Sequence, residues 1–228
     1  LRNCLLVLAL FVAVSTQASE NKDVLMFGVV PQQSTSALAQ SWLPLLENMS
    51  AHSGLELRFA TAPNIPEFER RLSRGEYDIA YMNPFHYVYF HSLVGYQAVA
   101  KEQNKKLGGI IVVGQDSEIV SIDQLDGQSL ALPSPAAFGA SLLTQSILAS
   151  QHIEPKVSYV GSHDSVYLAV TRGLFVAGGG IDRTLQTQPP ELKDQLRVVW
   201  RSPGFSPHAF AVHPRINAAQ AMRLQKAL

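Results

Sequence analysis

Serine residues follow three apolar, strand-like runs of the sequence, at points where helices are expected to begin. Ser34, Ser134 and Ser162 each lie a few residues beyond such a run, and His163 follows the third serine. The start of a helix presents unpaired backbone N–H groups and the positive end of the helix dipole, both of which favour an anion. Each hydroxyl taken alone is typical of a helix cap. Three such starts after three strands predict a shared anion-binding cleft.

The densest aromatic and polar stretch of the sequence lies at residues 81–87. Packing of rings into the core at the end of a strand is a sufficient explanation for Phe85. Tyr81, Asn83 and Tyr87 also carry hydrogen-bond donors that can orient a ligand oxygen. Ligands of α/β sheets bind beyond the carboxyl ends of the strands, so we expect these three side chains near the same cleft.

Strands and helices alternate along the first part of the chain. Apolar, β-branched runs at 24–30, 55–60 and 79–82 predict strands, and helical spacing of apolar residues predicts helices between them. Gly54 is a stop signal for the first helix, which Pro44 should kink or interrupt. This β-α-β-α-β order implies a parallel arrangement with helices on the faces of a sheet.

A second α/β set follows the first. Ser134 is expected to cap its first helix, at 136–150, and another helix is predicted at 163–172. The triple glycine at 178–180 is interpreted as a turn that permits close lobe packing. It is not a phosphate loop, because no Lys-Ser/Thr pair follows it. Two α/β sets fit two lobes with a cleft between them better than one continuous sheet. The predicted strands lie at 109–114, 129–132, 157–160, 196–200 and 209–212.

The N-terminus carries an export signal. A basic Arg2 precedes an apolar run at 5–14, and small residues follow, so residues 1–18 are predicted to be a cleaved signal peptide. The run is shorter than the about 20 residues that a membrane-spanning helix needs. Cys4, the only cysteine, precedes the run, so neither a lipid anchor nor a disulfide is expected. A periplasmic location follows from this prediction.

The two ends indicate part of a longer protein. The sequence begins with Leu1 rather than Met, and residues 217–228 form a helix-like stretch without a stop signal.

Composition argues against several classes of function. The chain carries 18 basic and 18 acidic residues without a basic stripe, so neither nucleic acid nor a membrane surface is an expected partner. The seven histidines show no zinc spacing. Adjacent residues such as Ser162, His163 and Asp164 cannot form a nucleophile–base relay among themselves. We therefore expect a monomer without a metal, a cofactor or catalytic activity.

Several short segments occur in an order that is shared with a known family. They lie at 27–34, 75–84, 123–127, 161–164 and 202–203. Together they resemble the phosphate/phosphite/phosphonate-type periplasmic solute-binding proteins of ABC transporters. The resemblance implies a type II periplasmic-binding-protein fold of class α/β, with two lobes of mixed sheets flanked by helices and a two-strand hinge. It implies a first lobe at 19–114 plus 204–228, a second lobe at 115–203, and an ABC transporter permease in the inner membrane as partner.

The resemblance also implies which residues contact a small anionic ligand. His163 matches the ligand-contacting histidine of the family. Where phosphonate binders carry hydroxyl residues, this chain has Ala136 and Ala137, and each lost charge-assisted bond is worth about 1.5–3 kcal/mol. Arg183 and His208 match positions where the family holds a ligand amine with carboxylates, so cationic side chains there favour a simple anion. The candidate ligand residues are Gln33, Ser34, Tyr81, Asn83, Tyr87, Ser134, Ala136, Ala137, His163, Arg183 and His208.

Three alternatives to transport of an oxyanion stay open at this point. The clamp can present its closed form to a membrane receptor kinase as a sensory module. It can bind a different small metabolite. It can also capture ferric ion through Tyr81, Tyr87 and a histidine.

Overall fold

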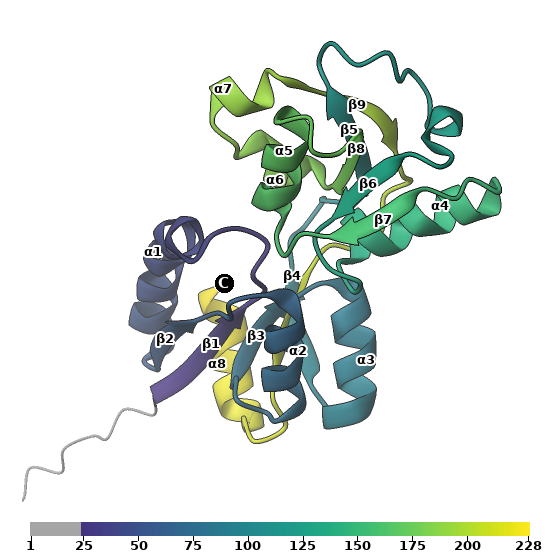
Figure 1. The fold of residues 1–228 in the computed structure, drawn as a ribbon. Coiled ribbons are helices and arrows are strands. Elements are labelled where there is room, and N and C mark those ends of the chain that lie inside the picture. Colours follow the sequence, from purple (N-terminus) through teal and green to yellow (C-terminus); the bar gives the residue numbers. More distant parts are fainter. Residues whose placement is uncertain (1–23) are drawn as a thin grey trace, which may run out of the picture.

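The computed structural model describes residues 24–228 and shows two lobes, each built on one five-stranded sheet (Figure 1). The strand order is β2-β1-β3-β10-β4 in the first lobe and β7-β6-β8-β5-β9 in the second. Both sheets are mixed: β1 runs parallel to β2 and β3, β6 runs parallel to β7 and β8, and β10 and β5 run antiparallel to their neighbours. This confirms the predicted two-lobed α/β fold. The predicted signal peptide and Cys4 lie outside the described residues.

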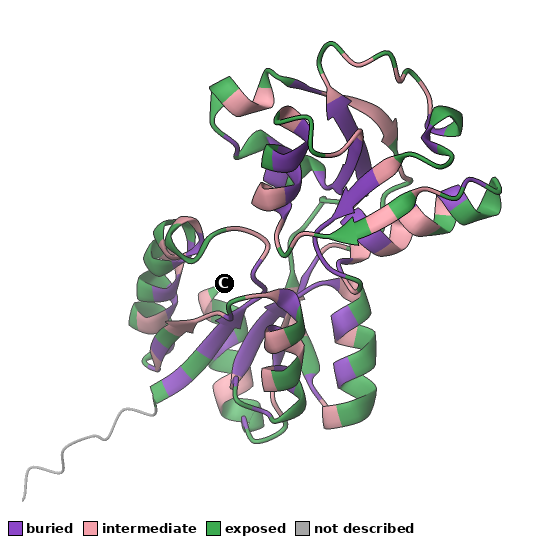
Figure 2. Cartoon of the chain, in the orientation of Figure 1, coloured by how far each residue is buried: buried purple, intermediate pink, exposed green. Residues whose placement is uncertain are grey.

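Helices cover both faces of each sheet, and the buried residues gather in the sheets and on the helix sides that contact them (Figure 2). Within residues 24–228, no helix combines the length and the apolar character needed to cross a membrane. The first lobe comprises β1 (Val24–Val29), α1 (Thr35–Ser53), β2 (Glu56–Ala60), α2 (Ile65–Ser73), β3 (Ile79–Met82), α3 (Pro84–Val94), β4 (Gln97–Lys101), β10 (Ala209–Val212) and α8 (Ala218–Ala227).

The second lobe has the same layered plan. It comprises β5 (Ile110–Gly114), a 3-10 turn η1 (Ile122–Leu125), β6 (Ser129–Leu132), a π-helical turn η2 (Phe138–Leu143), α4 (Thr144–Ser150), β7 (Lys156–Tyr159), α5 (His163–Thr171), β8 (Ala177–Gly180), α6 (Asp182–Gln186), α7 (Pro190–Lys193) and β9 (Leu196–Arg201).

Helix α1 begins and ends where the sequence predicts. The Ser34 hydroxyl accepts a hydrogen bond from the Ala37 N–H, and Gly54 ends the helix in the left-handed conformation with φ of 67°. The helix continues through Pro44, so of the predicted kink or boundary at that residue the boundary was wrong. A proline inside a helix removes one backbone hydrogen bond and costs about 3 kcal/mol. Burial of Trp42 and Leu46 on either side of Pro44 offsets that cost.

The triple glycine forms part of a buried strand, and its predicted assignment to a turn was wrong. Strand β8 lies between β6 and β5 in the second sheet, and every residue of the strand is buried. A Cβ atom at Gly179 would clash with the carbonyl oxygen of Ala140, and one at Gly180 would clash with Tyr167. Glycine is therefore required here because η2 and α5 pack directly against the strand.

Two extended segments connect the lobes, at residues 102–109 and 202–208. They lie side by side, since Leu107 and Phe205 exchange two backbone hydrogen bonds of 3.0 and 2.8 Å. Strand β5 lies beyond the first connection and pairs with β8 and β9 of the second sheet. Strand pairing thus places residues 110–114 in the second lobe, whereas the sequence predicts them in the first. An apolar strand run carries no signal for the sheet that it joins.

Candidate functional site

The turn after β1 contacts the start of α5 across the boundary between the lobes. The Gln32 carbonyl accepts a hydrogen bond of 3.1 Å from the His163 N–H, and Asp164 accepts one of 3.1 Å from the Ser34 N–H. Gln33 Nε2 donates to Thr187 Oγ1 at 2.9 Å. The lobes are therefore in direct contact at one side of the boundary.

A second group of contacts joins the ends of β3 and α3 to the other lobe. Asn83 accepts a hydrogen bond from the His86 N–H as the cap of α3, and its Nδ2 donates to the Ala136 carbonyl at 3.0 Å. Arg183 Nη1 lies 2.7 Å from Tyr81 Oη. These bonds show that the two lobes are in contact on this side of the boundary as well.

Three buried polar atoms at this boundary lack a hydrogen-bond partner within residues 24–228. They are Ser134 Oγ, His163 Nε2 and His208 Nε2, on side chains with exposed fractions of 3%, 1% and 3%. Nearly all buried polar groups in proteins have a partner, so such atoms together indicate a site for a polar ligand.

The role predicted for Ser134 as a helix cap was wrong. The helix of the second lobe opens with the π-helical turn η2, Ala137 takes the cap position, and no side chain caps it. The Ser134 hydroxyl is consequently left for another partner. Among the residues compared with phosphonate binders, Ala137 is buried and Ala136 is partly exposed.

His163 is a neutral imidazole held from behind by a hydrogen-bond chain. Its Nδ1 lies 3.1 Å from Thr184 Oγ1, which lies 2.8 Å from the hydroxyl of Tyr167. Burial lowers the pKa of His163 from its usual 6.5 to about 3. These hydrogen bonds fix the orientation of the His163 ring and leave its Nε2 available to bind a ligand.

His208 is also neutral, so the cationic character predicted for it was wrong. Its ring stacks on Tyr81, with centroids 4.9 Å apart and planes at 12°. Burial is the main cause that lowers the pKa of His208 to about 3, the charge of Arg183 lowers it further, and the rings of His86 and His163 are near enough to His208 to affect it. These neighbours place the three histidines and Arg183 around one region. Arg183 is thus the fixed positive charge of the site.

Tyr81 is buried between these groups and remains a neutral phenol. Burial raises the pKa of its hydroxyl, and the nearby Arg183 opposes that effect. Since Arg183 donates to this oxygen, the Tyr81 proton is available to a ligand.

The structure brings most of the predicted ligand residues to the lobe boundary but leaves Tyr87 elsewhere. Tyr81 packs on Trp42 of α1, whereas Tyr87 lies on α3, which covers the other face of the first sheet (Figure 1). The Tyr87 hydroxyl accepts a hydrogen bond of 3.4 Å from the Ala98 N–H. The two tyrosines of the ferric-ion alternative are therefore separated. Within residues 24–228, no group of three or more His, Cys, Asp or Glu side chains is placed to hold a metal ion.

Thr184 is a candidate site residue that the sequence did not single out. It lies on the short helix α6, next to Arg183, and orients His163. Its position directly after a buried strand could have identified it as a site residue. The signal was missed because that strand is the triple-glycine segment, for which the sequence alone predicts a turn.

Two α/β lobes in contact, with unpaired buried polar atoms between them, form an arrangement suited to holding a small solute. A family model described as "ABC transporter, phosphonate, periplasmic substrate-binding protein" matches residues 27–228. The chain belongs to this family. The match confirms the predicted class, the substrate-binding component of an ABC transporter. The family is one of transport proteins and not of enzymes, and the match does not support the sensory alternative.

Relatives of known name agree with this assignment. The chain is 23% identical over 222 residues to the "Phosphate-import protein PhnD" of Mycolicibacterium smegmatis, covering 87% of this chain and 69% of the relative. It is 23% identical over 203 residues to the "Phosphonates-binding periplasmic protein" of Escherichia coli, covering 82% of this chain and 60% of the relative. The chain therefore spans about two thirds of these proteins. A Prochlorococcus marinus protein solved in complex with methylphosphonate shares the fold, with a TM-score of 0.82, 16% identity, and 90% and 83% of the two chains covered.

Proposed function

We propose that this protein captures a small phosphorus oxyanion between its lobes and delivers it to an ABC transporter permease. The observation that carries the proposal is the set of unpartnered buried atoms, Ser134 Oγ, His163 Nε2 and His208 Nε2, beside the cationic Arg183. A tetrahedral oxyanion has several acceptor oxygens on different sides. Donors from both lobes match that shape, so the ligand stabilises the closed arrangement.

The chemistry of the donors favours an anion over a neutral solute. Ser134 and Tyr81 each carry a hydroxyl proton, and Arg183 contributes a charge that persists at all physiological pH values. A neutral imidazole donates from one nitrogen only. His163 and His208 can therefore pair with an ionised or a protonated oxygen of the ligand, according to their tautomers.

The ligand in this proposal is small and carries no amine. By the resemblance to the family, Arg183 matches a position that holds the amine of an aminoalkyl ligand, and two like charges at close range are unfavourable. Methylphosphonate, phosphite and phosphate satisfy both conditions.

The proposal also covers the export, location and partner of the protein in the cell. We infer that the protein is exported through residues 1–18, acts in the periplasm as a monomer, and presents its closed form to the permease. The family description and the name of the Escherichia coli relative support the location.

Isothermal titration calorimetry of the exported protein tests the ligand class. We expect binding of methylphosphonate, phosphite or phosphate, and at least about tenfold weaker binding of 2-aminoethylphosphonate because of Arg183. A ligand present at about 100 times its dissociation constant should also add about 2.7 kcal/mol of stability. If no phosphorus oxyanion binds a well-folded sample, the ligand class is wrong and the family assignment is unaffected.

A further inference from the structure

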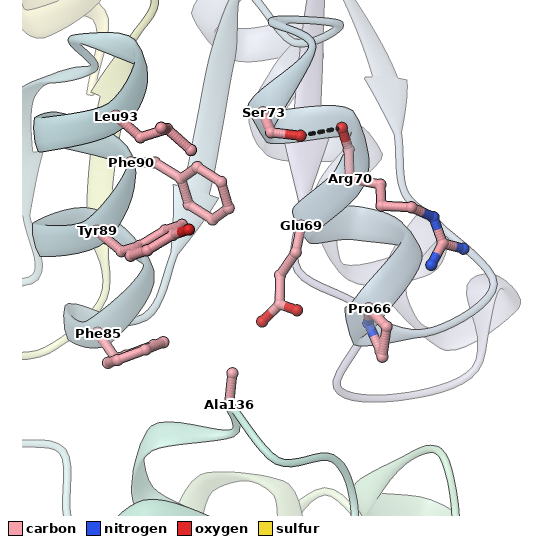
Figure 3. Close-up of a pocket in the computed structure, with 9 residues that line it drawn as sticks. All are labelled: Pro66, Glu69, Arg70, Ser73, Phe85, Tyr89, Phe90, Leu93 and Ala136. Carbon is pink, nitrogen blue, oxygen red and sulfur yellow. Dashed lines mark hydrogen bonds between the residues drawn. The ribbon is translucent and has the colours of Figure 1, made fainter.

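A separate cavity of about 430 Å³ lies between α2 and α3 of the first lobe (Figure 3). The two helices form its walls, and the second lobe contributes one residue to its rim. The cavity is lined by Pro66, Glu69, Arg70, Ser73, Phe85, Tyr89, Phe90, Leu93 and Ala136.

One carboxylate points into this cavity from α2. Glu69 Oε1 accepts a hydrogen bond of 2.9 Å from Nε2 of His86, whose side chain is fully buried behind it. The Glu69 side chain is 27% exposed, and its second oxygen has no hydrogen-bond partner within residues 24–228. Arg70 also lines the cavity, but its guanidinium points away from Glu69 and pairs with Glu67 (Figure 3). The negative charge of Glu69 is therefore held in place but not neutralised by Arg70.

Aromatic side chains of α3 line the wall opposite Glu69, and the rings of Phe85 and Tyr89 reach from the helix toward it (Figure 3). Phe85 and Tyr89 stack with centroids 6.2 Å apart, and Phe90 meets Tyr89 edge to face at 5.1 Å. Phe85 and Tyr89 are 41% and 52% exposed, which is high for adjacent large rings. Ring faces attract cations, most strongly organic ones that lose little hydration, and a carboxylate adds a full opposite charge.

Ala136 closes the rim of the cavity from the second lobe. Its carbonyl accepts the bond from Asn83, which caps α3 one turn before the aromatic wall. Since Ala136 belongs to the other lobe, the cavity is complete only when the lobes are closed.

We propose that this cavity binds a small organic ammonium ion, with Glu69 as its counter-ion and the rings of Phe85, Tyr89 and Phe90 as its wall. The cation lies on the outer side of the Asn83–Ala136 contact and is a second ligand of the clamp. The proposal does not depend on the oxyanion, because Glu69 and the aromatic wall are not among the candidate oxyanion ligands; the two sites share only Ala136, at the rim of the cavity.

Titration calorimetry with choline tests the proposal, and its neutral isostere 3,3-dimethylbutan-1-ol serves as the matched ligand. We expect choline to bind and the alcohol to bind at least about tenfold more weakly, because hydrogen bonds and contacts to a charged group are worth more than neutral ones. Equal sodium chloride in cell and syringe removes the effect of ionic strength.

Two variants locate the binding. Glu69→Gln keeps the shape of the side chain and should weaken choline binding about tenfold or more, because it removes the counter-ion. Tyr89→Leu on the exposed wall should weaken it a few-fold. Glu47→Gln on the exposed side of α1 and Tyr159→Leu on β7 are the matched controls and should leave binding unchanged. Equal binding of choline and the alcohol, no choline binding at millimolar concentration, or unchanged binding in Glu69→Gln would overturn the proposal.

Discussion

Arg183 of the second lobe donates a hydrogen bond of 2.7 Å to the hydroxyl of Tyr81 in the first lobe. Its guanidinium carbon also lies 5.8 Å from the centre of the Tyr81 ring, within the range of a cation–π interaction. His208 stacks on the same ring. Contact between the lobes therefore brings the positive charge of Arg183 next to Tyr81 and His208 in the cleft.

Replacement of Tyr81 by phenylalanine tests this link. Tyr81→Phe removes the acceptor of Arg183 and a donor to the ligand while it keeps the ring that packs on Trp42 and His208. We expect oxyanion affinity to fall about fivefold to tenfold, in line with the loss of one hydrogen bond to a charged group. Calorimetry measures the change, with Tyr159→Phe on the exposed β7 as control. Unchanged affinity would show that the cleft lies elsewhere.

Removal of the positive charge of Arg183 should lower oxyanion affinity more than Tyr81→Phe does. Arg183→Gln should weaken oxyanion binding at least about tenfold, because the charge lies in a partly water-excluded site. Arg201→Gln removes an exposed arginine of the same lobe that pairs with Asp182, and it should leave affinity within twofold or so. Similar losses in both variants would indicate a general surface effect and contradict a specific contact.

The buried histidines predict how stability changes with pH. The pKa of His163 is about 3 in the folded protein and 6.5 in an exposed chain, so the unfolded state binds more protons between these values. Stability should therefore fall as pH decreases from about 6.5 towards about 3. At pH 4.5, His163 alone should lower the free energy of unfolding by about 2–3 kcal/mol relative to pH 7.5.

Urea unfolding at these two pH values measures the effect. His163→Gln removes the titrating group, so its loss of stability between pH 7.5 and 4.5 should be smaller than that of the unchanged protein. His52→Gln, at an exposed helix end, is the control and should show the full loss. Equal pH dependence in all three proteins would show that His163 is not buried in neutral form.

The close packing around β8 makes a sharp prediction for stability. Gly179→Ala places a methyl group against the backbone of Ala140, which has no flexible end to move away. We expect a loss of about 2 kcal/mol or more, as for overpacked cores. Gly114→Ala, whose new methyl group would have open space, should change stability by less than about 1 kcal/mol. Thermal unfolding of both variants decides the comparison.

Regular elements of the fold were predictable because their signals are local. Ser34 and Gly54 bound α1 as expected, since capping and left-handed backbone depend on adjacent residues. Helix α3 was not predicted, because its Val88, Tyr89 and Phe90 have the side chains preferred in strands. Its boundary signals, Pro84 and Gly95, were nevertheless present in the sequence.

The site was predictable only in part, for reasons of tertiary structure. His163, Tyr81 and Ser134 were named from their positions after strands and from the family resemblance. The charge of His208 depends on complete burial, which the sequence does not reveal. Tyr87 lies one helical turn beyond Asn83, and the unpredicted α3 carries it to the other face of the sheet.

The glycines of β8 also determine which part of the site can move. They let side chains of α5 and the backbone of η2 pack directly against the strand, and Tyr167 connects this platform to Thr184 and then to His163. A close-packed unit of this kind has few alternative arrangements. In the proposed function, the half-site on the second lobe is therefore preorganised before the ligand arrives, and we expect selectivity among anions to reside mainly in that half. In the same proposal the first lobe is the part that moves, and its Tyr81 and Asn83 contact Arg183 and Ala136 of the second lobe when the lobes close on the ligand.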